Sequence, residues 1–256
     1  MNTQPVSKTR PSNPAIQLLY VLYSLTCYSI FLFTILYLIG FLGRWLVPKH
    51  IDSGEPQDVV FAILVDIALI TLFGLQHSVM ARKGFKDRLA HVMPAAIERA
   101  TYVLFSSLTL LLLFYLWQPI AVPVWSAESP LLRVVLSGLF WTGWGLALLA
   151  TFLISHFELF GLKQAIKAFR QTPPETPYFV TPSLYRIVRH PMYLGFLLAF
   201  WATPDMTVGH LVFALTSTAY IVVGAHLEEK DLVRAFGERY LDYQQRVGML
   251  LPFRKK

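Results

Sequence analysis

The chain has 256 residues, of which 55% are hydrophobic and only 14% are charged, whereas a soluble domain carries about 25% charged residues. This composition excludes a disordered, collagen-like or coiled-coil chain, because each of those needs a polar, repetitive or heptad sequence. A polytopic membrane protein remains. The formal net charge of +7 would suit either nucleic acid or a membrane surface. The single cysteine, Cys27, excludes a disulfide framework and a cysteine zinc site, and we expect it to be buried.

Four stretches with at most one charged residue are predicted to cross the bilayer. A helix needs about 20 apolar residues to cross a hydrocarbon layer of roughly 30 Å. The stretches are Ile16–Leu42, Val59–Leu75, Ala100–Trp117 and Val134–Ser155. The one charged residue is Asp66, for which we expect either a function inside the membrane or a hydrogen bond to a Tyr or Ser of a neighbouring span.

A fifth apolar region, Pro191–Leu227, is predicted to form a helical hairpin with Pro204-Asp205 as its turn. Met206–Leu227 is long enough to cross the membrane, but Pro191–Thr203 would rise only about 20 Å as a helix. The predicted fold is therefore an all-α integral membrane bundle with four spans, a C-terminal membrane hairpin and a final cytoplasmic helix. We expect one membrane-embedded domain over residues 1–256, with the substrate side in 1–177 and the ligand-binding hairpin in 178–256.

The distribution of positive charge predicts the orientation of these spans. With the N-terminus in the cytoplasm, 19 of the 22 Lys and Arg residues fall on the cytoplasmic side, and only Arg44, Lys49 and Arg133 fall on the other. Cytoplasmic loops of membrane proteins carry this excess of basic residues. We therefore expect both termini in the cytoplasm, and the bilayer rather than nucleic acid accounts for the basic charge.

The densest polar region, Tyr185–Gly195, lies where the chain enters the predicted hairpin. A helix that begins at Pro191 leaves free N–H groups that favour a carboxylate or another anion. Tyr185 and Tyr193 offer flat, hydrogen-bonding surfaces for a nucleoside, and Gly195 allows a ligand or another helix to approach closely. The alternative interpretation is an aromatic and basic belt at the membrane interface.

A second polar region, Glu228–Asp231, lies where the hairpin leaves the membrane. The helix is predicted to continue along an apolar stripe that includes Leu232, Phe236 and Tyr243. Glu229 falls on this stripe, so it is expected to face protein or ligand, with Arg189 or a ligand ammonium as its partner.

The two polar regions together resemble the C-terminal half of the isoprenylcysteine carboxyl methyltransferase superfamily, which includes phospholipid methyltransferases and NnrU-like proteins. The resemblance covers about residues 178–253 and includes Tyr185-x3-Arg189-His190-Pro191-x-Tyr193-x-Gly195, Glu228-Glu229 and Phe236-Gly237. It implies that S-adenosylmethionine (SAM) binds at the cytoplasmic face. The residues that match cofactor positions are Phe179, Val180, Thr181, Tyr185, His190, Tyr193 and Glu228, and we add the adjacent Arg189 and Glu229 to the expected cofactor site.

Two departures from this superfamily concern the substrate. The isoprenylcysteine enzymes carry an Arg four residues before the matching Glu, where this chain has Gly224. This difference argues against a prenylcysteine carboxylate as the substrate. A smaller departure is Ser183, where the family usually has Gly.

Three segments of the N-terminal half resemble the bacterial methanethiol S-methyltransferase family. They are Gly74–Arg82, Glu98–Tyr102 and Ser155–Gln164. This resemblance covers nearly the whole chain. It implies the conversion of methanethiol and SAM to dimethyl sulfide and S-adenosylhomocysteine, in the inner membrane of a bacterial cell.

The expected catalytic residues lie at span ends on the side where the cofactor motifs emerge. A thiol attacks as its thiolate, so a general base is useful at neutral pH. His77 is the first candidate for this base, Glu98 or Glu158 would orient it, and Arg99 would offset the developing negative charge. His77, His156 and Glu158 would also suit a metal, but no two-histidine helical spacing is present, and we expect no metal.

Other classes of membrane protein stay open from the sequence alone. They are a SAM-dependent methyltransferase of a lipid or of isoprenylcysteine, a sterol-type reductase that uses NADPH, and a transporter or other non-enzymatic membrane protein. The absence of two related halves counts weakly against a transporter. We infer no obligate protein partner and no nucleic acid.

Overall fold

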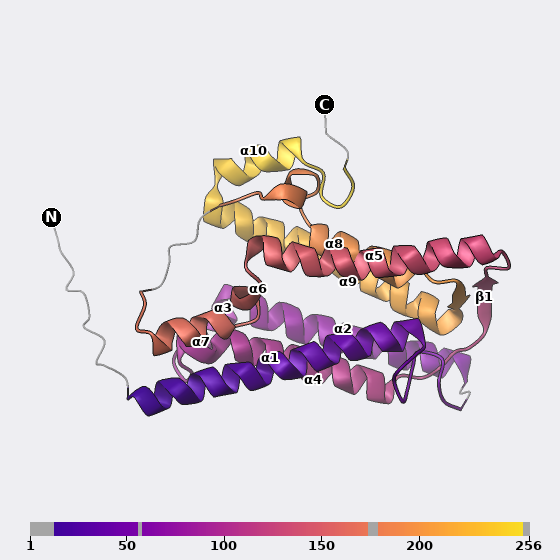
Figure 1. Ribbon diagram of the computed structural model, residues 1–256, viewed down its shortest axis with the longest axis horizontal. Coiled ribbons are helices and arrows are strands. Elements are labelled where there is room, and N and C mark those ends of the chain that lie inside the picture. The colour runs from indigo at the N-terminus through magenta and orange to yellow at the C-terminus, as the bar shows by residue number, and fades with distance from the viewer. Residues whose placement is uncertain (1–12, 56–57, 174–178, 253–256) are drawn as a thin grey trace.

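The computed structural model describes residues 13–55, 58–173 and 179–252, and helices dominate it (Figure 1). Parts of the predicted charge distribution, such as Lys8 and Lys256, lie outside the described residues. Five helices are long and apolar enough to cross a membrane. They are α1 (Pro14–Gly43), α2 (Val59–Ala81), α4 (Ala95–Leu116), α5 (Pro130–Ile154) and α9 (Val208–Phe236). The prediction of an all-helical, multi-pass membrane protein is confirmed.

Capping side chains fix where four of these helices begin. Asn13, Asp58, Ser129 and Thr207 each accept a hydrogen bond from a backbone N–H in the first turn of the helix that follows. The end of α2 was harder to predict, because its apolar run stops at Leu75 whereas the helix continues to Ala81. Helix α9 continues beyond Leu227 through the acidic segment, as predicted.

The predicted hairpin is present, with α8 (Pro191–Trp201) as its short arm. The turn after α8 contains β2 (Asp205–Thr207), which pairs antiparallel with β1 (Pro123–Ser126) from the connection between α4 and α5. This small sheet was not predicted, because strands of three and four residues leave no alternating pattern to detect. It ties the turn of the hairpin to the start of α5.

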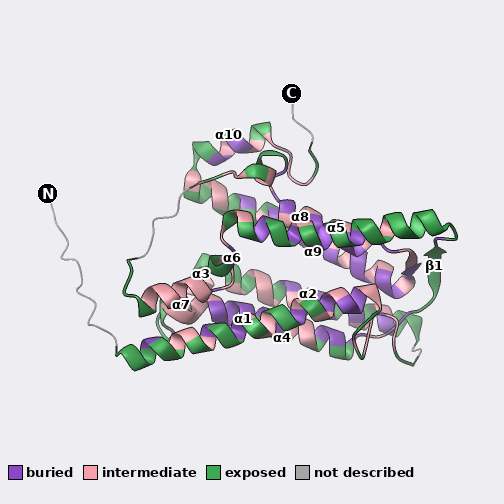
Figure 2. Cartoon of the chain, viewed as in Figure 1, coloured by how far each residue is buried: buried purple, intermediate pink, exposed green. Residues whose placement is uncertain are grey.

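The helices form two layers that run side by side (Figure 1). One layer contains α1, α2 and α4, and the other contains α5, α8 and α9. Helix α2 packs against α9 and so joins the layers. Large apolar side chains such as Leu22, Leu36 and Leu64 are exposed on the outer surface (Figure 2), as expected for helices that face lipid. Cys27 is buried, as predicted.

Helices α5 and α8 approach each other through glycines. A Cβ atom added at Gly143 would lie 2.6 Å from the backbone oxygen of Gly195, and one added at Gly195 would lie 2.6 Å from that of Gly143. Ala147 and Ala199 extend the same contact by one turn. Small residues let two membrane helices pack backbone to backbone. The prediction that Gly195 permits a close approach is confirmed, and the partner is a helix.

All the short helices gather at one end of the bundle, called here the basic end (Figure 1). It is the end at which α2, α5 and α9 terminate and α4 and α8 begin. The short helices are α3 (Lys83–Leu89), α6 (His156–Leu159), α7 (Leu162–Phe169), the 3₁₀ turn η1 (Ser183–Arg186) and α10 (Glu238–Arg246). The expected continuous helix after Glu229 is interrupted, because Gly237 has a φ of 58° and separates α9 from α10.

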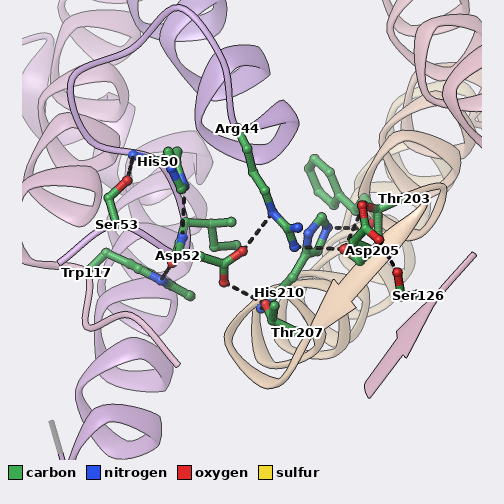
Figure 3. Close-up of polar contacts among 12 residues, drawn as sticks. Arg44, His50, Asp52, Ser53, Trp117, Ser126, Thr203, Asp205, Thr207 and His210 are labelled. Carbon is green, nitrogen blue, oxygen red and sulfur yellow. Dashed lines mark hydrogen bonds and ion pairs between the residues drawn. The ribbon is translucent and has the colours of Figure 1, made fainter. Parts of the chain in front are cut away.

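A polar network at the opposite end, called the β end, ties the two layers together (Figure 3). The Arg44 guanidinium pairs with Asp52 at 2.7 Å and donates to the backbone carbonyl of Asp205 at 2.7 Å. Asp52 also accepts a hydrogen bond from Thr207 at 2.7 Å. Two hydrogen bonds from Arg133 hold Asp205 and are the main reason why the pKa of its carboxyl is lowered to about 2. These contacts join the end of α1 to the hairpin turn.

Candidate active site

At the basic end, Arg189, His190 and Glu229 form a nearly buried ionic cluster. Arg189 donates to both carboxylate oxygens of Glu229, at 2.5 and 3.1 Å, and His190 Nε2 lies 3.1 Å from the first. The Gln244 amide donates to the second at 2.8 Å. The expectation that Arg189 is the partner of Glu229 is confirmed. Because protein groups occupy both oxygens, this cluster fixes the start of α8 against α9 and α10.

The adjacent carboxylate, Glu228, is in a different environment. Its side chain is 47% exposed and accepts a hydrogen bond from the Tyr193 hydroxyl at 2.7 Å. The ring of Tyr193 stacks on that of His190 with the centroids 5.2 Å apart. A carboxylate has about four lone-pair sites, so Glu228 keeps acceptor capacity beside two stacked rings. This combination suits a ligand that has both a positive charge and hydroxyl or amino donors.

The segment before α8 lines the same region and packs against α10. Tyr185 donates to the backbone carbonyl of Ala150, at the end of α5, over 3.3 Å. Burial raises the pKa of the Tyr185 phenol, and the negative charge of Glu228 raises it further. Phe179 contacts the rings of Tyr240 and Tyr243. Tyr185 thus lies within electrostatic reach of Glu228, while Phe179 anchors the segment.

Val180 and Thr181 follow this anchor. Val180 is 48% exposed. The backbone carbonyl of Thr181 accepts a hydrogen bond from Arg186 at 3.2 Å. The expected cofactor role of Val180 and Thr181 stays a prediction.

His77, near the end of α2, contacts two hydroxyl groups of α4. Its Nδ1 lies 3.2 Å from Ser106 Oγ, and its Nε2 lies 2.6 Å from the Tyr102 hydroxyl. We expected Glu98 or Glu158 to orient this histidine, whereas Ser106 has that position. Tyr102 is 8% exposed, so the contact is nearly buried.

The hydrogen bonds of Ser106 assign the tautomer of His77. Ser106 donates its only hydroxyl proton to the backbone carbonyl of Tyr102 at 2.9 Å. Toward His77, therefore, Ser106 accepts, and the proton of the neutral imidazole lies on Nδ1. The Nε2 atom then has the lone pair and accepts from the Tyr102 hydroxyl. The lone pair of Nε2, the basic nitrogen of His77, is therefore occupied by the hydrogen bond from Tyr102.

Arg99 and three phenols connect this pair to Glu228. The Arg99 guanidinium lies 5.1 Å from the centroid of the Tyr102 ring and donates to the backbone carbonyl of Leu159 at 2.8 Å. The charge of Glu228 acts on the phenols of Tyr102, Tyr193 and Tyr220. Residues from α2, α4, α8 and α9 therefore surround one polar region at the basic end.

The other expected catalytic acids have partners elsewhere. Glu158 pairs with Lys163 at 2.9 Å, and this hydrogen bond is the main reason why the pKa of Glu158 is lowered. Glu98, near the start of α4, acts electrostatically on Lys86 of α3. His156, which we considered as a metal ligand with His77 and Glu158, instead bonds to Tyr28 and Thr151.

Sequence reasoning did not single out Tyr102, Ser106 or Tyr220 as site residues. The first two lie four residues apart, so they share one face of α4 in an uncharged part of the span. That spacing could have indicated from the sequence that the two hydroxyl groups lie together. Tyr220 gave no such signal, because nothing in the sequence indicates that α9 packs against α2.

Comparison with known proteins identifies relatives over almost the full chain. Residues 42–247 match a family model described as "Protein of unknown function (DUF1295)". A protein named methanethiol S-methyltransferase from Pseudomonas deceptionensis is 62% identical over 252 residues, which cover 98% of this chain and 96% of that protein. One of the same name from Mycobacterium tuberculosis is 46% identical over 235 residues, covering 92% and 96%.

More distant relatives include nurim from Xenopus laevis, which is 32% identical over 180 residues and covers 65% of this chain and 61% of that protein. No solved structure matches the chain. The family model spans more than half of the sequence, and several relatives of one name cover nine-tenths or more of it. The chain therefore belongs to the DUF1295 family and to the methanethiol S-methyltransferase family.

Proposed function

We propose that this protein is an S-methyltransferase that transfers the methyl group of SAM to methanethiol and produces dimethyl sulfide. Relatives of this name cover nearly the whole chain. The structural observation that carries the proposal is the convergence at the basic end. The residues proposed for the cofactor, around Glu228 and Tyr193, and those proposed for the thiol, around His77, come from opposite halves of the sequence and surround one region.

The side chains around Glu228 fit the chemistry of SAM. This cofactor combines a sulfonium cation, an amino group, ribose hydroxyls and an adenine ring, and when bound it supplies an electrophilic methyl group. Glu228 would accept from the amino or hydroxyl groups, while Tyr185, His190 and Tyr193 supply flat surfaces for the ring. Arg189 and Glu229 would act by holding α8 in place. Phe179, Val180 and Thr181 would border the site.

The residues near His77 suit deprotonation of a small thiol. A cysteine thiol titrates near 8.5, so a simple alkanethiol is mostly protonated at pH 7 and benefits from a base. A positioned base contributes a factor of about 10²–10⁴ in rate. His77 would be that base, and the Arg99 guanidinium would stabilise the thiolate. Glu98 and Glu158 would shape the surrounding electrostatic field, because each interacts with a lysine.

The membrane location agrees with a small apolar thiol as substrate, because such a molecule can enter from the bilayer. We place the protein in the inner membrane of a bacterial cell with both termini in the cytoplasm, where SAM is available. Isoprenylcysteine is disfavoured as a substrate because Gly224 stands where those enzymes have an Arg. A Cβ atom added at Gly224 would meet no atom of the described residues within 4 Å.

The direct test supplies purified protein with methanethiol and SAM and measures dimethyl sulfide by gas chromatography. We expect dimethyl sulfide to form only when both substrates are present. Parallel calorimetry compares SAM with NADPH, and only SAM is expected to bind. Binding of NADPH without SAM would favour a reductase, and binding of neither would favour a protein without this enzymatic role.

A further inference from the structure

We propose that Tyr102 is a catalytic residue of this methyl transfer: its hydroxyl oxygen takes the proton of the thiol while its own proton passes to Nε2 of His77. The inference rests on the proposed function. It changes the role of His77 from the direct base to the final proton acceptor, and it assigns the contact with substrate to a residue of α4.

The hydrogen-bond network is the first reason. Ser106 fixes the Nδ1–H tautomer, so Nε2 is the only basic atom of neutral His77. The Tyr102 hydroxyl lies 2.6 Å from Nε2 and occupies it. A thiol cannot reach this lone pair unless Tyr102 moves away. The phenol oxygen, in contrast, has a free lone pair once its proton points at His77.

The position of Tyr102 relative to the proposed cofactor residues is the second reason. Its phenol interacts electrostatically with Glu228 and with Tyr193, which hydrogen bonds to that carboxylate. Tyr102 therefore belongs to the same polar region as the residues proposed to hold the methyl donor. A thiol bound at its phenol oxygen would be in that region as well.

The step balances without any other reactant. The S–H bond of the thiol breaks, and its proton joins the Tyr102 oxygen as the original phenol proton moves to His77 Nε2. The thiolate forms a new S–C bond to the methyl group, and the electron pair of the broken donor S–C bond stays on the donor sulfur. The chain is left with neutral Tyr102 and the His77 imidazolium, which returns its proton to water.

The charged and titratable groups around this pair act in both directions. Arg99, on α4, places a positive charge over the Tyr102 ring and favours the brief phenolate character of the relay. Burial and the same positive charge disfavour the imidazolium of His77, so it must return its proton to water before the next turnover. Glu228 and Tyr220 of α9 and Tyr193 of α8 interact electrostatically with the Tyr102 phenol.

A second tyrosine–histidine pair supplies a matched control. Thr151 donates to the backbone carbonyl of Leu148 at 2.7 Å, so it accepts from His156 Nδ1, and His156 Nε2 accepts from Tyr28 at 2.8 Å. This pair has the same tautomer and the same kind of bond, but it joins α6 to α1. Tyr28→Phe therefore removes an equivalent hydroxyl outside the proposed site.

The experiment measures turnover of Tyr102→Phe, His77→Ala, the double variant and Tyr28→Phe at pH 7 and at pH 9.5. We expect Tyr102→Phe and His77→Ala each to lose about 10² in turnover at pH 7, and the double variant to lose no more than the single ones. The loss should shrink toward pH 9.5, because free thiolate then forms without help. Tyr28→Phe should keep normal turnover, and calorimetry should give unchanged SAM affinity in Tyr102→Phe.

Two outcomes would overturn the relay alone. If His77 contacted the thiol directly, Tyr102→Phe would free Nε2 and turnover at pH 7 would be normal or higher. If Tyr102 only supported the fold, its defect would be the same at both pH values and additive with His77→Ala. A wild-type protein that binds no SAM or forms no dimethyl sulfide would instead overturn the proposed function, and the relay with it.

Discussion

Glu228 and Glu229 are adjacent in the sequence and yet have different chemistry. Glu229 is held by Arg189, His190 and Gln244, and its side chain is 9% exposed. Glu228 is 47% exposed and accepts a hydrogen bond from Tyr193. The sequence placed both in the cofactor site. Their contacts separate a residue available to a ligand from one that holds helices together.

This contrast predicts that substitution by Gln affects mainly SAM affinity at Glu228 and mainly stability at Glu229. Glu228→Gln keeps the side-chain size but removes the charge, and a hydrogen bond to a charged group contributes about 1.5–3 kcal/mol. We expect SAM affinity to fall roughly 10-fold to 100-fold with little change in thermal stability. Glu229→Gln leaves the Arg189 charge buried without its partner, which typically costs about 3–5 kcal/mol. We expect this variant to lose stability first.

Calorimetric titration with SAM and thermal unfolding followed by fluorescence would measure the two effects. The assignment of Glu228 would fail if Glu228→Gln bound SAM as tightly as the wild type. Loss of SAM affinity in Glu229→Gln without loss of stability would instead place Glu229 in direct contact with the cofactor.

At the residue scale, the sequence pattern predicted which side chains need a polar partner better than it predicted which group that partner is. The Arg189–Glu229 pair was inferred correctly because a carboxylate on an apolar stripe needs a cation. Asp66 shows the limit. We expected either a function inside the membrane or a hydrogen bond to a Tyr or Ser of another span, whereas its carboxylate accepts a hydrogen bond from the backbone N–H of Gln118 at 2.9 Å. A backbone partner leaves no signal in the sequence.

Among the elements, the pair α5 and α8 holds the start of the cofactor region in place. Their backbones meet at Gly143 and Gly195, and Gly195 follows Tyr193 by two residues and His190 by five. Hydrophobic runs predicted both helices, and the Pro204-Asp205 turn predicted the short arm. The crossing itself was not predictable, because a glycine in a membrane helix does not identify its partner.

Two glycines of α5 test the importance of this crossing. A Cβ atom at Gly143 would lie 2.6 Å from the backbone nitrogen of Ala199, whereas one at Gly145 would meet nothing within 4 Å. Gly143→Leu should therefore force the helices apart, which typically costs about 1–3 kcal/mol for overpacking, and should also weaken SAM binding by shifting α8. Gly145→Leu, two residues away, should affect neither property.

Thermal unfolding and SAM titration of both variants would measure these effects. Equal stability of Gly143→Leu and Gly145→Leu would contradict the tight crossing. Reduced stability of Gly143→Leu with unchanged SAM affinity would show that the α5–α8 crossing does not position the cofactor residues.

Across the whole molecule, the three basic residues that the charge bias assigns to the outer face all lie at the β end and bond to protein groups. Arg44 and Arg133 hold Asp205, and Lys49 donates to the backbone carbonyls of Tyr115 and Trp117. Each of these three basic residues therefore has a structural role. The remaining described Lys and Arg residues lie toward the basic end, which agrees with the predicted orientation.

Cysteine labelling would test this orientation in intact cells. The protein has one cysteine, Cys27, which is 1% exposed, so Cys27→Ala gives a suitable background. Asp52 looked suitable for a label from sequence, but it is tied to Arg44, and the exposed Glu55 is the better position at the β end. Because basic loops stay in the cytoplasm, we expect a membrane-impermeant maleimide to label Glu55→Cys in spheroplasts, and to label Arg88→Cys only after the membrane is permeabilised. Labelling of both positions from outside would contradict the proposed orientation. Labelling of Arg88→Cys alone from outside would reverse it. It would also put the proposed active site on the side of the membrane that lacks SAM.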